Sequence, residues 1–428
     1  MYKPWLEFRD KLIAATQWML CASAVSFPFS VAATNIVLGV ALASGAISGL
    51  LWTGMRNLWE GNRVLALALL GYLNFMFVGL LWSLDQEWGL HILGRQWFWL
   101  LVPLAVAALR DPAWSKRFLL ALSLGLGLHL LFCAFQMLGW ITVTVSGSSV
   151  DNATGHIGHI GFGFVYGIWA VWLLYWGWKQ KHCLRWGAWI LALWSLVTVF
   201  LAHGRSGYLI TLALLVTMAW KALSSGFRKR YASAALGILV LIIALILFGP
   251  ARERLLGTWQ PLATNKPIEV KPDNLKKPAA NSALSTQYRL SLLRGAISAW
   301  KKHPILGVGT GGFPEAAAQA KRENPSLNYR VVDYPAHPHN AYLQALVRWG
   351  PLGLAMLAFL LYSWIKLGWR LDWKSGEAGP LIALSGIALL IHALSSSSLE
   401  DHFSAILAAM LLGAGLAQLY PHDTSESP

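Results

Sequence analysis

Long apolar runs separated by short charged breaks dominate the chain. Runs of about 17 or more apolar residues recur along it, which is the length a helix needs to cross the hydrocarbon core of a bilayer. We predict twelve spans, centred near residues 20, 41, 73, 103, 130, 169, 195, 216, 240, 360, 387 and 411. The predicted fold class is therefore all-α, a polytopic integral membrane protein.

One long polar segment interrupts this pattern. We predict spans one to nine in residues 1–249, a large loop with short helices in 250–350, spans ten to twelve in 351–420 and a cytoplasmic tail in 421–428. The composition agrees, because 56% of the residues are hydrophobic and only 12% are charged. Such a balance leaves little material for a soluble domain outside the loop.

Lysine and arginine residues indicate the orientation, because positive charges close to span ends resist translocation. With the N-terminus inside, the cytoplasmic segments hold eighteen of the 34 basic residues, whereas the short external loops hold only Arg95 and Arg205. The other fourteen lie in the long loop, and a loop of that length can be translocated whatever its charge. We therefore expect the loop to face the periplasm or its equivalent.

Within the loop, the pattern predicts an irregular linker followed by three short helices. Glu253–Ala280 is rich in Pro, Lys and Asn and has no apolar period. Helices are expected over Ser285–His303, over Pro314–Arg322, and from about His339 to Gly350. Between the first two lies the glycine-dense segment Ile305–Phe313, whose backbone can approach another surface closely.

His339 is the leading candidate for proton transfer. It stands where the polar loop meets a predicted span, at or next to a helix N-terminus. The positive end of the helix dipole disfavours the protonated imidazole and lowers its pKa, so that the ring could accept a proton. The structural alternative is that His339 caps the helix or bonds a neighbouring carbonyl. His337, two residues earlier, competes for the same role.

Several other polar residues are expected at the outer face. Arg205 lies in a break between two spans, where an arginine either meets an anion or snorkels to the lipid headgroups. Arg95 has the same two interpretations. His156 and His159 could contact a phosphate or lie in a solvated turn.

Acidic residues are few on this side. Glu400 and Asp401 lie at the last outer break, where they could orient an imidazole, pair an arginine, or occupy a solvated turn. Asp85 and Glu87 form the only external D-x-E, so little favours a metal site. The long loop has fourteen basic against six acidic residues, which predicts an anionic partner such as a phosphate or pyrophosphate lipid headgroup. Nucleic acid is not expected as a partner.

Three blocks of sequence resemble the module shared by the O-antigen ligase and O-antigen polymerase superfamily. They are Arg294-Gly-Ala-Ile-Ser-Ala-Trp300, His303-Pro-Ile-Leu-Gly-Val-Gly309 with Gly312-Phe313, and His339-Asn-Ala-Tyr-Leu-Gln344 with Trp349-Gly-Pro-Leu-Gly353. The Arg205-Ser-Gly207 turn is similar as well. The specific motifs cover only residues 205–207 and 287–353, and the histidine blocks are the more specific of them.

This resemblance implies a glycosyltransferase in the bacterial inner membrane that works on its periplasmic face. It would move a glycan from undecaprenyl pyrophosphate to a sugar hydroxyl of lipid A-core. His339 corresponds to the essential histidine, Arg205 to the turn arginine and Arg289 to the arginine ahead of the His-Pro block. Asp401 corresponds to an acidic position near the last outer turn, with Glu400 beside it. The predicted substrate-binding residues are Arg95, His156, His159, His337, Asn340, Arg348 and Asp401.

The residue types suit that reaction without a metal or another cofactor. An imidazole can take the proton of the incoming hydroxyl, and forked guanidinium groups can hold the departing pyrophosphate. Direct displacement would invert the anomeric configuration, whereas a covalent glycosyl-histidine would retain it. A polymerase or a protein O-oligosaccharyltransferase of the same superfamily remains an alternative, because the motifs concern the donor. A secondary transporter is a further alternative from another class.

Overall fold

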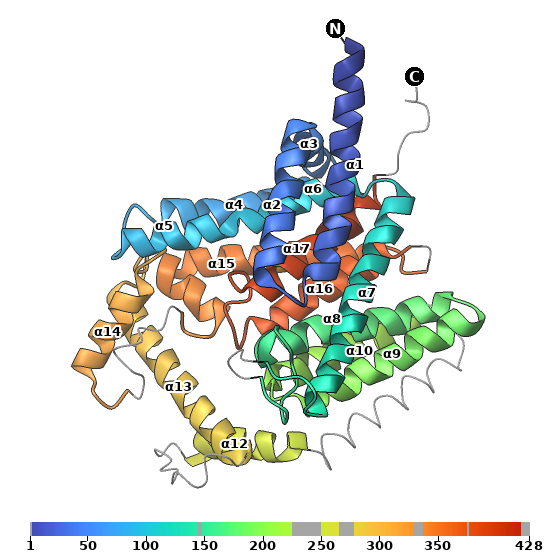
Figure 1. Ribbon diagram of the computed structural model, residues 1–428. Helices are drawn as coiled ribbons and strands as arrows, with labels where there is room; N and C mark the ends of the chain where they lie inside the picture. The colour runs from blue at the N-terminus through green and yellow to red at the C-terminus, as the bar shows by residue number, and fades with distance from the viewer. Residues whose placement is uncertain are drawn as a thin grey trace.

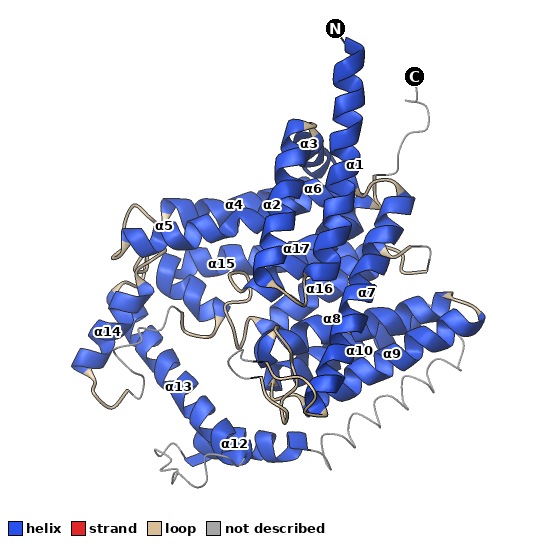
Figure 2. Ribbon diagram, in the orientation of Figure 1, coloured by secondary structure: helices blue, strands red, loops and turns tan. Residues whose placement is uncertain are grey.

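The computed structural model describes residues 2–143, 148–224, 250–264, 278–327, 337–374 and 376–420. Within these ranges every regular element is a helix, as Figures 1 and 2 show. The all-α prediction is therefore confirmed for the described part of the chain. Residues 225–249, which include the span predicted near residue 240, lie outside it.

The helices fall into two groups along the chain. The first group is α1 (Tyr2–Ser26), α2 (Val31–Ile47), α3 (Leu50–Gly61), α4 (Arg63–Val78), α5 (Gln86–Gly94), the 3-10 helix η1 (Arg95–Leu100), α6 (Leu101–Ala108), α7 (Pro112–Met137), α8 (Gly158–Lys179), α9 (His182–Leu201) and α10 (Arg205–Ser224). The second group is α12 (Pro250–Thr264), α13 (Pro278–Lys302), α14 (Phe313–Glu323), α15 (Ala341–Arg370), α16 (Ala378–His392) and α17 (His402–Ala417).

The predicted spans correspond to helices in the described residues. Eleven of the twelve centres lie on helices, from α1 at residue 20 to α17 at residue 411. By length and apolar composition, six described helical segments could cross a membrane, or seven if the bent pair α2 and α3 is one span. The chain thus has the helices of a multi-pass membrane protein, and the number twelve stays a prediction.

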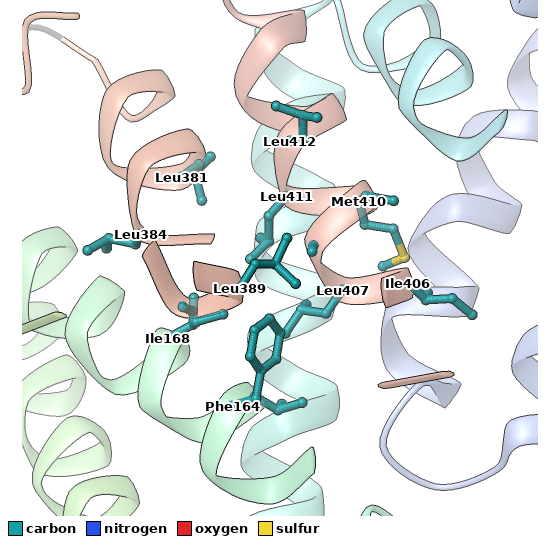
Figure 3. Close-up of a cluster of buried hydrophobic side chains, with 14 of the residues drawn as sticks. Phe164, Ile168, Leu381, Leu384, Leu389, Ile406, Leu407, Met410, Leu411 and Leu412 are labelled. Atoms are coloured by element: carbon teal, nitrogen blue, oxygen red, sulfur yellow. The ribbon is translucent and has the colours of Figure 1, made fainter. Parts of the chain in front are cut away.

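The core lies where α8, α16 and α17 meet. Of the most apolar window of α8, 89% is buried, against 39% for its neighbours α9 and α10. A helix that is apolar on all sides requires such a central position. Figure 3 shows side chains from the three helices meeting there, with Phe164 and Ile168 close to Leu389 and Leu407. This core holds the N-terminal ends of α8 and α17, which contribute residues to the cavity described below.

The interpretation of Glu253–Ala280 as an irregular linker is wrong for its first part. Residues 250–264 form α12, and α13 begins at Pro278 rather than Ser285. The buried Arg254 holds α12 in place by donating to the carbonyls of Leu201 and Ala202, at 3.0 and 2.7 Å. These carbonyls end α9 and lack helical partners, so a tertiary contact stabilises α12 where apolar periodicity gave no indication. Residues 265–277 lie outside the described part.

The helix predicted to end at Gly350 does break there. Gly350 adopts φ 67° inside α15, and Pro351 has no N–H to offer the carbonyl of Val347. The glycine-dense segment supplies the missing donors: Val308 N donates to Val347 O at 2.8 Å and Gly309 N to Arg348 O at 2.9 Å. The predicted close approach of this backbone is confirmed, and the surface that it approaches is the protein's own.

Substitution of Gly309 tests the close approach of this segment to its neighbours. It has φ 82°, and a Cβ there would lie 2.2 Å from the Cα of Ser83. Gly49 has φ 85° with nothing within 4 Å of such a Cβ, so it controls for the backbone conformation alone. We expect Gly49→Ala to cost about 1 kcal/mol of folding free energy, and Gly309→Ala to cost more than twice as much because backbone atoms must move. Thermal melting of the detergent-solubilised protein measures both, and equal melting temperatures would contradict the contact.

Candidate functional site

A cavity of about 400 Å³ collects most of the predicted site residues. Its walls come from four separated parts of the chain, namely the α5 to η1 junction, the start of α8, the start of α15, and the segment from Ser396 to Phe403. Seven of the ten predicted residues line it: Arg95, His156, His159, His337, His339, Arg348 and Asp401. Arg205, Arg289 and Asn340 do not.

His339 stands in a strained backbone conformation at the cavity wall. Its φ is 53°, in the left-handed region that non-glycine residues seldom adopt. Its backbone N–H donates to His337 Nδ1 at 3.2 Å, and the two rings meet edge to face at 4.5 Å. The Nδ1 atom of His339 is buried and has no hydrogen-bond partner among the described residues. One ring nitrogen is therefore not engaged by a described residue.

Asn340, and not His339, caps the helix. The Asn340 side-chain oxygen accepts from Leu343 N at 2.9 Å, and its Nδ2 donates to Leu394 O at 3.2 Å. Both ends of the amide are thus used inside the protein, which favours a capping role for Asn340 over the predicted substrate contact. The capping alternative considered for His339 does not hold.

Burial and nearby charge keep the two histidines neutral. The pKa of His339 is lowered to about 3, chiefly by burial and then by His337 and Arg289. Burial likewise lowers the pKa of His337 to about 4, followed by the charges of Arg348 and Arg95. The direction predicted for His339 is confirmed, but its chief cause is desolvation and not the helix dipole. At neutral pH the ring is a proton acceptor.

Arg205 and Arg289 are within electrostatic reach of each other, and Arg289 also acts on His339. Arg205 donates to Thr286 Oγ1 at 2.6 Å, to Ser285 Oγ and the Ser282 carbonyl at 3.2 Å, and to Thr258 Oγ1. These contacts tie the start of α10 to α12 and α13, so Arg205 does not snorkel to headgroups. Arg289 follows Ser285 and Thr286 by one helical turn on α13 and forms no hydrogen bond within the described ranges. It is close enough to act electrostatically on Arg205, His159 and His339.

Arg348 is paired inside the protein. Its side chain is 1% exposed and forms a two-pronged ion pair with Glu400, whose side chain is 13% exposed. Gln344 Nε2 also donates to the Glu400 carboxylate, at 2.9 Å. Glu400 thus pairs an arginine, one of the roles expected for the acidic turn. Because its charge is neutralised, Arg348 shapes the cavity wall more than it attracts an anion.

The remaining predicted residues take different positions around the cavity. Arg95 begins η1 and donates to the Glu400 carbonyl at 3.4 Å. Asp401 accepts from Ser404 Oγ at 3.1 Å, and burial raises its pKa. The His156 ring stacks on Phe132 at 5.7 Å between centroids. Asp85, of the external D-x-E, caps α5 by accepting from Trp88 N at 2.8 Å.

Some cavity residues were not singled out from the sequence. His402 lines the cavity with a buried Nε2 that has no partner in the described part of the chain, and Ser396 and Ser397 lie beside it. The run of four serines ahead of Glu400 at an outer break was the available indication, since polar residues are scarce next to spans. Only the fold brings that break to His337.

The family comparison agrees with the motifs. Residues 190–358 match the model of the family described as O-antigen ligase. Over these residues the chain is similar to that family. The resemblance to the O-antigen ligase and polymerase superfamily is therefore confirmed, and the matched segment contains His339, Arg205, Arg289 and Arg348. No protein with curated annotation matches the chain significantly.

Part of the cavity wall comes from residues outside the matched segment 190–358. Arg95, His156 and His159 come from helices before residue 190, and Glu400, Asp401 and His402 come from the chain after residue 358. The matched segment thus supplies one wall of the cavity, which the flanking helices complete.

Substitutions can test the buried Arg348–Glu400 pair. Glu400→Gln leaves the Arg348 charge buried and uncompensated, so we expect the free energy of unfolding to fall by about 3 kcal/mol. Glu60→Gln is the control, because the Arg56–Glu60 pair is exposed, with side chains 76% and 66% accessible, and should contribute little. The Arg348→Met/Glu400→Gln double variant should recover most of the loss. Equal melting temperatures for Glu60→Gln and Glu400→Gln would contradict the role of the pair.

Proposed function

We propose that this protein is an O-antigen ligase. It transfers O-antigen polysaccharide from undecaprenyl pyrophosphate to a sugar hydroxyl of lipid A-core on the periplasmic face of the inner membrane, with residues 250–350 on that face. The observation that carries the proposal is His339, whose Nδ1 has no hydrogen-bond partner among the described residues, in a cavity wall and within electrostatic reach of Arg289, inside the segment that matches this family.

The transfer step follows from these groups. The acceptor oxygen attacks the anomeric carbon while His339 takes its proton, and the bond from that carbon to the pyrophosphate oxygen breaks. The pyrophosphate leaves with the bonding electrons, and the guanidinium groups of Arg289 and Arg205 stabilise its charge. Arg205 would exchange its present hydroxyl partners, Ser285 and Thr286, for phosphate oxygens. No metal is needed in this scheme, and the configuration at the anomeric carbon inverts.

Donor binding also adjusts the base. A group with a pKa of about 3 is a weak proton acceptor, and Arg289 is one cause of that low value. A pyrophosphate beside Arg289 brings negative charge close to His339, which favours the protonated imidazole and raises its pKa. His339 therefore becomes a stronger base when the donor is in place, so donor binding and proton removal are coupled.

Three alternatives share part of this chemistry. A polymerase or a protein O-oligosaccharyltransferase would use the same donor residues with another acceptor. Attack by the His339 nitrogen itself would form a glycosyl-histidine and retain configuration. A transporter would need charged groups at the membrane midplane, whereas the charged cavity residues here lie at helix ends.

Substitution of His339 tests the proposal in the native host. His339→Ala should lower the transfer rate by a factor of about 100 to 10,000, the contribution usual for a positioned base, and abolish the O-antigen ladder on lipopolysaccharide gels. His182→Ala is a matched control, because His182 is exposed on a distant helix end and has a similar φ of 50°.

The gel separates the alternatives. A normal ladder in the His339→Ala strain would refute the ligase mechanism. Loss of long chains with a single repeat retained on the core would identify a polymerase instead. Unchanged lipopolysaccharide together with loss of glycosylated protein would indicate a protein O-oligosaccharyltransferase.

The coupling of donor binding to the base predicts a specific pH dependence. The free-enzyme base has a lowered pKa, so kcat/KM for the donor should stay level as pH falls through 6.5, the ordinary histidine value. The acid limb of kcat, which reports the donor complex, should lie at higher pH than that of kcat/KM because bound pyrophosphate raises the His339 pKa. Rates of the purified enzyme from about pH 4 to pH 9 measure both limbs. Coincident limbs would contradict the coupling.

A further inference from the structure

The cavity wall itself carries a positive group, apart from Arg205 and Arg289, which lie outside that wall. Arg95 lies in its wall, is exposed, and forms no ion pair within the described residues. Its one hydrogen bond to a described residue, the Glu400 carbonyl, is long at 3.4 Å. A guanidinium carries five N–H donors, so most of those of Arg95 remain open toward the cavity.

The two histidines have different charged neighbours. The charged neighbour of His339 is Arg289, whereas those of His337 are Arg348 and Arg95. The Glu400 carboxylate cancels the charge of Arg348. Arg95 is therefore the arginine of the cavity wall without a paired carboxylate in the described residues, whereas Arg289 lies outside that wall, within electrostatic reach of His339.

Other polar groups surround Arg95. His402 is within reach of its charge and has a buried Nε2 without a partner in the described part of the chain. Asp401 is within electrostatic reach of Arg95, but it accepts from Ser404 Oγ and forms no ion pair with Arg95. A guanidinium and a free ring nitrogen facing one cavity form a site for an oxyanion.

The reaction geometry indicates which substrate carries that anion. In a direct displacement, the incoming hydroxyl and the leaving group lie on opposite faces of the anomeric carbon. If Arg289 and Arg205 hold the leaving pyrophosphate, then the groups beyond the histidine pair face the acceptor. We propose that Arg95 and His402 form a subsite for an anionic substituent, a phosphate or a carboxylate, on the acceptor glycan. This inference rests on the proposed function and extends it to the acceptor.

Binding measurements test the subsite independently of turnover. The probe is lipid A-core from a strain without O-antigen, titrated by thermophoresis against the detergent-solubilised full chain. Arg95→Gln should weaken its binding about tenfold, the loss of one charge-assisted contact, and His402→Gln should weaken it by less. Arg56→Gln, an exposed arginine on α3, is the control and should bind as the wild type does. Melting temperatures establish that each variant is folded.

Modified acceptors identify the anion. One sample of the probe has its phosphates removed, and a second sample has its carboxylates esterified. One of these two treatments should weaken wild-type binding to the level seen with Arg95→Gln. The modification that does so identifies the group, and Arg95→Gln should then lose its effect on that probe. An equal effect of Arg95→Gln on a probe stripped of both groups would overturn the subsite.

Transfer assays separate this inference from the proposed function. With an active enzyme, Arg95→Gln should raise KM for the acceptor about tenfold and leave KM for the donor unchanged. A rise in the donor KM alone would assign Arg95 to the pyrophosphate and refute the acceptor subsite. Absence of transfer by the wild type, with Arg95-dependent binding of the probe, would refute the ligase function and keep the subsite.

Discussion

The site depends on one backbone contact. Pro351 and Gly350, whose φ is positive, interrupt α15 and leave the carbonyls of Val347 and Arg348 without helical donors. The backbone N–H groups of Val308 and Gly309 donate to these two carbonyls. An unsatisfied carbonyl in such a buried place would cost free energy comparable to a lost hydrogen bond, so the two segments hold each other. The contact fixes the short first half of α15, which begins two residues after His339 and carries Arg348 near its end.

The four arginines in and around the cavity differ in their partners. Arg348 is neutralised by Glu400, Arg205 is held by hydroxyl and carbonyl oxygens, and Arg289 and Arg95 lack a carboxylate partner. Uncompensated guanidinium groups in a partly dehydrated cavity are costly unless an anion joins them. The histidines between them avoid this cost by staying neutral. A cavity of this kind is suited to anionic substrates and keeps a proton acceptor in its middle.

The motif sequences located the leading histidine and the glycine-dense turn because these positions have strict local requirements. Gly309 and Gly350 adopt conformations that other residues resist, and Asn340 caps a helix next to His339. Local patterns also gave α14 and the break in α15. They failed for α12, which Arg254 stabilises through carbonyls some fifty residues away in sequence. They also gave no partner for Glu400 and no role for His402.

The sequence by itself determined the helical, apolar character of the chain, its resemblance to the O-antigen ligase family and the histidine proposed as base, because apolar run length and backbone-restricted motifs are local properties. Only the tertiary structure decided which charges stand alone. Arg348 and Glu400 are separated by 52 positions, and Arg205 reaches Thr286 across 81. Whether an arginine is paired or free depends on distances between helices, and these follow from packing around α8, α16 and α17 that no local pattern encodes.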